Sequence, residues 1–264
     1  MRIFAISDLH VDHPENARWV SQLSAWDYRQ DALICAGDIT HTLAQIEKTL
    51  VTLQKRFQVV AYLPGNHELW VRYQSTQDSL EKFRDIQNVA SGSGVQTGVV
   101  HLDAVSLVPV LAWYDHSFAE PSEELREKWA DYQMCLWPEN FDQPRITRHF
   151  LSANPPFTPD PGRTVISFSH FVPRSDLLPS GRKTIELLRP VLGAEAIDDH
   201  VRKLGSSMHI YGHYHVNQRT ERGGITYINN AFGYPRETHI TAKKLLCVFE
   251  ETQHGDTQAQ RNIE

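Results

Sequence analysis

Side chains that bind metal ions occur at five places in this sequence, each directly after a run of apolar residues. The five segments, in chain order, are Asp8-Leu9-His10, Gly37-Asp38, Gly65-Asn66-His67-Glu68, Ser169-His170 and Gly212-His213-Tyr214-His215. Aspartate, asparagine and histidine offer oxygen and nitrogen ligands, which suit Mn²⁺, Fe or Zn²⁺ and do not distinguish among them. Since the chain has 14 histidines and three cysteines, the sequence predicts a metal site without thiolate ligands.

Each segment also has an ordinary structural interpretation. An Asp-x-His pair is more often a surface or capping pair, and a Gly-Asp step is commonly a turn. A single buried histidine such as His170 is more often a satisfied core residue than a ligand. The order of the segments and their shared position after apolar runs favour the metal-binding interpretation. On extended backbone, the pairs Asp8/His10 and His213/His215 also point their side chains in the same direction.

The elements that must position these side chains can be predicted from hydrophobic periodicity. Apolar runs predict strands at 2–7, 32–36 and 59–63, and helices are expected around 15–26 and 43–57. Later strands are expected at 99–112, 164–169, 207–211, 225–228 and 243–249. Short buried strands that alternate with amphipathic helices indicate a parallel or mixed sheet covered on both faces. Because ligands of such sheets bind beyond the carboxyl ends of the strands, the five segments should converge on one crevice. Glycines 37, 65 and 212 fit turns in which the backbone approaches an ion or its ligands closely.

A segment of different character, at about 113–163, interrupts this pattern. It contains Trp113, Trp129 and Trp137, a predicted helix near 122–136 and a proline-rich exit. We expect an insertion packed over one end of the sheet, because its aromatic side chains need apolar partners. These tryptophans either line a substrate pocket or anchor the insertion, and the anchoring role is favoured.

Composition limits the class of protein. The 264 residues are 41% hydrophobic and 22% charged, which is typical of a globular chain with a sizeable core. We expect a single domain over 1–250, with the insertion inside it, and a polar tail at 251–264. The apolar runs are too short to span a membrane, and the first residues do not resemble a signal peptide. A net charge of −6 argues against a broad nucleic-acid interface.

Cysteine usage predicts the cellular compartment. Cys35, Cys135 and Cys247 cannot all pair, and they lie far apart in the sequence. We therefore expect a reducing, cytoplasmic location and no disulfide framework. The oligomeric state stays open at this stage.

The ordered set of motifs resembles the calcineurin-like metallophosphoesterase superfamily, from Met1 to about Phe249 apart from the insertion. The resemblance implies an α/β fold, a four-layer α/β/β/α sandwich of two mixed sheets, with the site at one edge. The ligands that it implies for a first metal ion are Asp8, His10, Asp38 and His215. Asp38 would bridge to a second ion, and the ligands that complete that site would be Asn66, His170 and His213. In this family the residue at the position of His67 is not a ligand but reaches the substrate.

The implied chemistry is hydrolysis of a phosphate ester. Two divalent ions about 3.5–4 Å apart can clamp a phosphate and activate the water between them, and manganese is the favoured metal. Our mechanistic hypothesis is in-line attack on phosphorus by a metal-bridging hydroxide. His67 would act as the general acid that protonates the leaving oxygen. The predicted catalytic residues are His67, Asp38 and Asn66.

Two departures from the family pattern narrow the range of activities that we expect. Ile39-Thr40-His41 follows Asp38 in place of the Asp-Arg-Gly of protein serine/threonine phosphatases, and the iron-binding tyrosine of purple acid phosphatases has no counterpart. We expect a hydrolase of a small phosphodiester or phosphomonoester. The alternative is a nuclease or RNA-processing phosphodiesterase, which the acidic balance does not favour, and a second alternative is a non-catalytic metal-binding scaffold. Glu68 is expected to orient or cap its neighbours, and Arg174 to be a surface residue rather than a phosphate contact.

Overall fold

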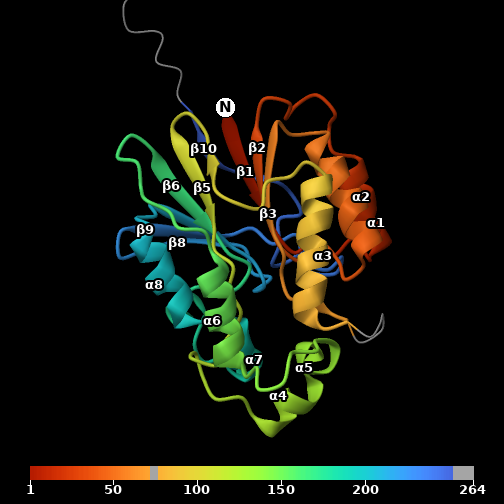
Figure 1. The fold of residues 1–264 in the computed structure, drawn as a ribbon, viewed down its shortest axis with the longest axis vertical. Coiled ribbons are helices and arrows are strands. Elements are labelled where there is room, and N and C mark those ends of the chain that lie inside the picture. Colours follow the sequence, from red (N-terminus) through yellow and green to blue (C-terminus); the bar gives the residue numbers. More distant parts are fainter. Residues whose placement is uncertain (72–76, 252–264) are drawn as a thin grey trace, which may run out of the picture.

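Residues 1–71 and 77–251 are described by the computed structural model, and their strands form two sheets that pack against each other (Figure 1). The strands are β1 (Arg2–Ile6), β2 (Ala32–Ala36), β3 (Val59–Leu63), β4 (Val100–His101), β5 (Val105–Pro109), β6 (Thr164–Phe168), β7 (Met208–Tyr211), β8 (Gln218–Arg222), β9 (Ile225–Asn229) and β10 (Leu246–Glu250). The helices are α1 (Pro14–Ser21), α2 (Leu43–Gln54), α3 (Ser79–Gly92), α4 (Glu123–Lys128), α5 (Ala130–Met134), α6 (Gln143–Ala153), α7 (Lys183–Leu192) and α8 (Glu195–Lys203). Single 3₁₀ turns occupy His67–Leu69 and Ser175–Leu177.

Both sheets are mixed: most of their strands are parallel, and antiparallel strands lie at one edge of the four-stranded sheet and at both edges of the six-stranded sheet. The four-stranded sheet has the order β10-β1-β2-β3, and the six-stranded sheet has the order β4-β5-β6-β7-β9-β8. Strands β1 to β3 are parallel, as are β5, β6, β7 and β9, whereas β10, β4 and β8 pair antiparallel with their neighbours. Within each sheet, the parallel strands therefore end at a common edge.

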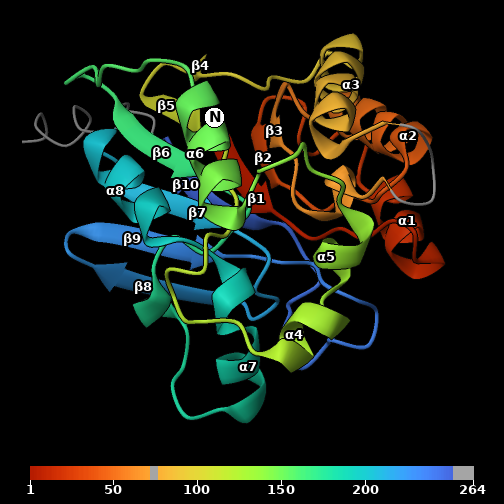
Figure 2. The same ribbon diagram turned by 60° about the horizontal axis from the view of Figure 1, so that its bottom comes forward.

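Side-chain alternation builds the layers. Residues at every second position face the other sheet, such as Ile34 and Ala36 of β2 opposite Ile166 and Phe168 of β6, and they form one buried cluster. The intervening residues pack against helices in a second cluster. Figures 1 and 2 show α1, α2 and α3 on the side of β1–β3, and α6, α7 and α8 on the side of the six-stranded sheet. The four-layer α/β/β/α sandwich implied by the sequence is confirmed.

The predicted strands agree with the structure to within a few residues, with two exceptions. The expected strand at 99–112 is divided into β4 and β5, which pair with each other. The edge strand β8 was not predicted, because its sequence Gln-Arg-Thr-Glu-Arg is largely exposed and offers no apolar run. It pairs with β9 alone at the end of the sheet.

The ends of the predicted helices differ more from the structure than those of the strands. The helix expected at 15–26 ends at Ser21, and the one expected at 43–57 ends at Gln54. The helix expected near 122–136 is broken into α4 and α5, because Trp129 has extended backbone angles (φ −70°, ψ 123°). Helices α3, α6, α7 and α8 were not predicted.

The segment 113–163 contributes α4, α5 and α6, and α4 and α5 lie beyond the carboxyl ends of β1–β3 (Figure 1). Trp113 is buried, packs against Trp137 and Phe171, and donates from Nε1 to Gln143 Oε1 over 2.9 Å. Trp113 therefore anchors the segment rather than lining a pocket.

Most of the predicted polar tail, 252–264, falls outside the described residues. Within 1–71 and 77–251, no helix combines the length and the apolar character needed to cross a membrane.

Candidate metal centre

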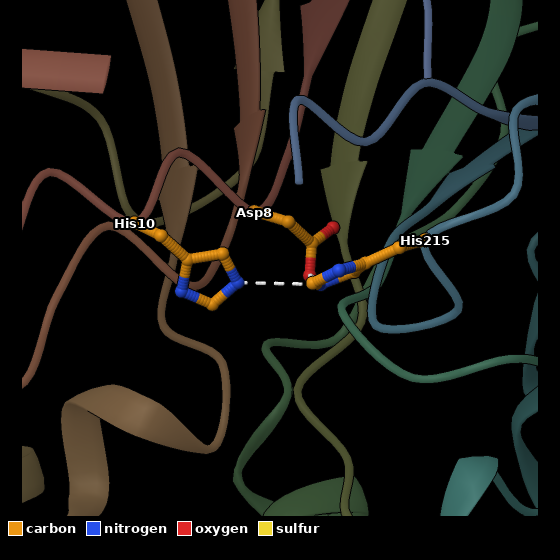
Figure 3. A group of neighbouring side chains, drawn as sticks. All are labelled: Asp8, His10 and His215. Atoms are coloured by element: carbon orange, nitrogen blue, oxygen red, sulfur yellow. Dashed lines mark hydrogen bonds and ion pairs between the residues drawn. The ribbon is translucent and has the colours of Figure 1, made fainter. Parts of the chain in front are cut away.

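Loops at the carboxyl ends of β1, β2, β3, β6 and β7 bring the predicted ligands together. In the part of the chain that the structure describes, three groups of side chains hold ligand atoms within 4.8 Å of one another. The groups are Asp8, His10 and His215; His10, Asp38 and His67; and Asp38, His170 and His213. Figure 3 shows how His10, from the loop after β1, and His215, from the loop after β7, meet beside Asp8. The five segments singled out in the sequence thus converge.

The first group is centred on facing imidazole nitrogens. His215 Nε2 lies 3.1 Å from Asp8 Oδ1 and 3.2 Å from His10 Nε2. Two nitrogens bound to one tetrahedral ion at about 2.1 Å are about 3.4 Å apart, so this spacing fits a shared cation. The donor set therefore fits a metal ion.

In the second group, nitrogen and oxygen atoms also face one another at distances that fit a shared cation. His170 Nε2 lies 3.0 Å from Asn66 Oδ1, 3.2 Å from His213 Nδ1 and 3.4 Å from Asp38 Oδ1. The other carboxylate oxygen of Asp38, Oδ2, lies 4.0 Å from His10 Nε2. Asp38 thus directs one oxygen toward each group, as expected of a bridging ligand.

Three of the histidines form a hydrogen bond through the ring nitrogen that faces away from the cluster. His170 Nδ1 lies 2.9 Å from the carbonyl oxygen of Ala36, and His213 Nε2 lies 3.0 Å from that of Val191. His215 Nδ1 lies 2.8 Å from Glu237 Oε2. An imidazole that donates its outer N–H in this way keeps a lone pair on the inner nitrogen, which is the usual arrangement behind metal-ligating histidines.

Backbone strain is concentrated in the loops that carry the ligands. Asp8, His10, Asp38 and His213 have positive φ angles of 54°, 42°, 56° and 65°. The extended backbone expected for the pairs Asp8/His10 and His213/His215 was therefore wrong. Residues with a side chain seldom adopt positive φ angles unless the surrounding structure enforces them, and such residues cluster at functional sites.

The three glycines predicted to allow close approach do so. A Cβ at Gly37 would lie 2.7 Å from His170 Nδ1, and one at Gly212 would lie 2.6 Å from Asp8 Oδ2. A Cβ at Gly65 would lie 2.7 Å from His170 Nε2. Any larger residue at these positions would displace a predicted ligand.

Glu68 joins the loops after β2 and β3. Its buried carboxylate accepts hydrogen bonds from the backbone N–H groups of Asp38 (3.0 Å), Ile39 (2.6 Å) and Gly65 (2.8 Å). Burial and the charge of Asp38 raise the pKa of Glu68 to about 8. The interpretation of Glu68 as an orienting residue is confirmed by these contacts.

Ionic interactions within the cluster oppose the effect of burial. Burial disfavours charge on both Asp8 and His215, but their mutual attraction and hydrogen bond outweigh it. The pKa of Asp8 consequently falls to about 2, and that of His215 rises to about 10. For His10, burial and the neighbouring His67 lower the pKa well below its usual value. Asp8 and His215 therefore form an ion pair beside the neutral imidazole of His10, and a cation that binds His215 through Nε2 must displace the proton of that nitrogen.

His67 lies at the accessible edge of the cluster. Its side chain is 15% exposed, and its Nε2 lies 3.7 Å from Asp38 Oδ2. The backbone N–H of His67 donates to Asp38 Oδ1 over 3.0 Å. The imidazole stacks on Trp70, with ring centroids 3.8 Å apart. The ring is therefore held in place while one side remains open to solvent.

Three residues of the site were not predicted from the sequence. Glu237, behind His215, and Tyr234, which stacks on His10 with ring centroids 4.5 Å apart, both belong to the loop after β9. The strand-end rule applied to the predicted strand 225–228 would have found this loop. The third is Asp131 of α5, which contacts Asn66 and has no recognisable signal in the sequence.

Arg174 is engaged away from the cluster. Its guanidinium pairs with Asp176 at 2.7 Å and with Asp198 at 3.3 Å. This agrees with the surface role expected from the sequence.

A family model for calcineurin-like phosphoesterases matches residues 1–217. The chain belongs to this family. It is accordingly a metallophosphoesterase, and the side chains that converge at the strand ends are the groups from which a metal site of the family can be built.

Two comparisons extend along nearly the whole metallophosphoesterase chain. It is 26% identical over 267 residues to acyl-carrier-protein phosphodiesterase PptH of Mycobacterium tuberculosis, covering 89% of this chain and 78% of that protein. The crystal structure of phosphopantetheinyl hydrolase PptH from the same organism matches with a TM-score of 0.74 and 24% identity. That match covers 97% of this chain and 98% of the other, so the fold is shared from end to end.

Proposed function

We propose that the protein is a dinuclear metal-dependent phosphodiesterase. The observation that carries the proposal is the position of Asp38, which directs one carboxylate oxygen toward His170 and the other toward His10. A carboxylate shared in this way can hold two ions close together and offset part of their repulsion.

In this proposal, two sets of ligands hold the ions. The first set is Asp8, His10, Asp38 and His215, and the second set is Asp38, Asn66, His170 and His213. When bound, the ions supply Lewis-acid stabilisation of the phosphate oxygens and activate a water molecule. Manganese is the proposed metal.

His67 is the proposed general acid. Its partial exposure and its stacking on Trp70 support this role, because a proton donor must face the substrate with a fixed orientation. From this position its imidazolium donates a proton to the leaving oxygen of the ester. Asn66 contributes to catalysis through its carbonyl oxygen, which faces His170 at 3.0 Å.

The similarity to acyl-carrier-protein phosphodiesterase supports a more specific proposal for the substrate. That similarity covers 89% of the chain, and the match to the PptH crystal structure covers 97%. We infer that the phosphodiester joins a phosphopantetheinyl group to a carrier protein. A small phosphodiester or phosphomonoester is the broader form of the proposal.

Hydrolysis assays with small esters test the metal dependence and the preference for a diester. Protein stripped with a chelator and reloaded with Mn²⁺ is assayed with bis-p-nitrophenyl phosphate and p-nitrophenyl phosphate, beside the Asp38→Asn variant. We expect metal-dependent turnover of the diester that the variant loses. Turnover of the monoester alone would contradict a phosphodiesterase, and turnover of neither by a metal-loaded protein would favour the non-catalytic scaffold.

The carrier-protein substrate requires its own assay. A phosphopantetheinylated carrier protein is incubated with the Mn²⁺-loaded protein, and its intact mass is followed by mass spectrometry. Loss of the phosphopantetheine mass is the expected result. Unchanged carrier protein beside rapid cleavage of a single-stranded RNA would instead support the nuclease alternative. The proposal retains the cytoplasmic location predicted from cysteine usage, which cell fractionation can test.

A further inference from the structure

Helix α5 of the insertion places a buried carboxylate directly behind the second group of ligands. Asp131 is 2% exposed. Its Oδ1 accepts hydrogen bonds from Asn66 Nδ2 at 2.9 Å and from Trp70 Nε1 at 2.7 Å, and its Oδ2 accepts from Trp129 Nε1 at 2.9 Å. Three N–H groups therefore converge on one side chain, two from the residues that flank the turn after β3 and one from the insertion.

These contacts determine which way the amide of Asn66 faces. An ionised carboxylate only accepts hydrogen bonds, so it selects the NH₂ end of the amide. With Nδ2 directed to Asp131, Oδ1 is directed to the opposite side, where it lies 3.0 Å from His170 Nε2. A flipped amide would place the NH₂ group in the second ligand group and leave two oxygens in contact with each other.

The same carboxylate also fixes the neighbours of two other site residues. Trp70 donates to Asp131 and stacks on His67, and Trp129 donates to Asp131 with its ring centroid 6.0 Å from that of His213. Asp131 thus lies at the point where the insertion meets the ligands of the second group and the proposed general acid.

We propose that Asp131 is a positioning residue for the second metal ion, which it serves by holding the carbonyl oxygen of Asn66 toward that ion. This rests on the two-ion centre of the proposed function. Residues that orient metal ligands typically change metal affinity by about 10–100-fold when they are replaced. A purely structural role, in which Asp131 only joins the insertion to the sheet, would lower stability without selecting one ion.

A double-mutant cycle separates these two roles. Metal-free wild type, Asp131→Asn, Asn66→Ala and the double variant are titrated with Mn²⁺ by calorimetry. We expect two ions in wild type, and one of them bound about 10–100-fold more weakly in Asp131→Asn while the other is unaffected. Because Asp131 acts through Asn66, adding Asp131→Asn to Asn66→Ala should weaken that ion no further.

Two variants provide matched controls. Asp115→Asn removes the same charge from the same insertion, and among the described residues its side chain bonds only the backbone N–H of Ser117. Asp142→Asn removes a charge at the start of α6 in the same insertion, where the side chain accepts from the backbone N–H of Arg145. Both should bind the two ions as wild type does. Equal weakening of both ions in Asp131→Asn, or additive effects with Asn66→Ala, would overturn the proposal.

A measurement on the unaltered protein covers the case in which Asp131→Asn fails to fold. Indole N–H resonances are followed by NMR while metal-free wild type is saturated with diamagnetic Zn²⁺. Those of Trp70 and Trp129 should shift, whereas that of Trp113, which donates to Gln143, should not. Resonances that all stay in place, or all shift alike, would overturn the proposal.

The failure of this proposal is distinguishable from failure of the metal centre. Wild type that binds two ions, with unchanged binding in a folded Asp131→Asn, contradicts only the role of Asp131. Wild type that binds fewer than two ions contradicts the dinuclear centre and this proposal together.

Discussion

Several candidate ligands form a second contact that fixes their orientation. Glu237 holds His215, the Ala36 carbonyl holds His170, and Asp131 holds Asn66. These contacts leave the inner atoms of the ligands turned toward one another across about 3 Å. His67 differs, because it is fixed by stacking on Trp70 while one edge remains accessible.

Replacement of His67 by alanine tests its role as an acid. A general acid matters most when the leaving group is a poor one, so we expect a loss of about 100-fold or more on alkyl esters. The loss on nitrophenyl esters, whose leaving group needs little protonation, should be less than about tenfold. Initial rates on both ester classes check this, with bound Mn²⁺ measured to show that the metal is retained. Equal losses on the two classes would rule out proton donation by His67.

At the scale of single residues, the sequence predicted the candidate ligands but few of their supporting contacts. The ligand types and their positions after apolar runs were sufficient to select Asp8, Asp38 and the histidines as candidates, and the structure brings these side chains together. The contacts from Glu237 and Asp131 arise from loops whose paths depend on the folded structure, and a lone carboxylate is too common to indicate such a role.

At the scale of elements, the short loops after the strands place their backbones against the ligands. Glycine is required where a loop passes within contact distance of a ligand, and Gly65 is the clearest case, since a Cβ there would meet both Asp38 and His170. Glu68 then ties this loop to the one after β2. The two loops therefore behave as one unit.

Gly65→Ala should accordingly disturb the site and lower stability. We expect a loss of about 1–3 kcal/mol in the free energy of unfolding, because neither the ligands nor the backbone has room to move, together with weaker metal binding. Gly92→Ala is the matched control, since no described atom lies within 4 Å of its added Cβ at the end of α3. It should alter stability by no more than about 1 kcal/mol, in the favourable direction. Denaturant unfolding checks both, and a stable Gly65→Ala with full metal content would contradict the argument.

Continuous apolar runs explain why β1, β2 and β3 were predictable to within a residue. Such runs are long enough for a buried strand and too short for a helix. Exposed β8 lacks this signal. The break between α4 and α5 also escaped prediction, because extended backbone at Trp129 accompanies the hydrogen bond from its indole to Asp131. This hydrogen bond is local, between residues two positions apart, and the apolar periodicity used to predict the helix does not report it.

At the scale of the whole molecule, two sheets with parallel centres place their ligand-bearing loops side by side. The six-stranded sheet contains a buried histidine. The His209 side chain is fully buried, and its two ring nitrogens contact the hydroxyl groups of Ser167 and Ser169. Burial lowers the pKa of His209 to about 3. The folded protein therefore keeps this imidazole neutral under conditions in which the unfolded chain protonates it.

This difference predicts a loss of stability in acid. Between about pH 6.5 and pH 3 the unfolded state binds one more proton at His209 than the folded state, so stability falls as the pH falls. The slope should be about 1.4 kcal/mol per pH unit. His209→Gln keeps a polar side chain between the serines but cannot titrate, so its stability should decline less steeply in acid. Unfolding free energies of both proteins at pH 7 and pH 4.5 check this, and parallel declines would contradict it.

The central claim is that Asp38 joins two metal ions into one centre, and electron paramagnetic resonance of the Mn²⁺-loaded protein tests it most directly. We expect two ions per chain by elemental analysis and a spectrum of two spin-coupled ions. In Asp38→Asn the coupling should weaken or disappear, because the amide offers one oxygen in place of two. A single ion per chain, or two ions with independent spectra in wild type, would contradict the account.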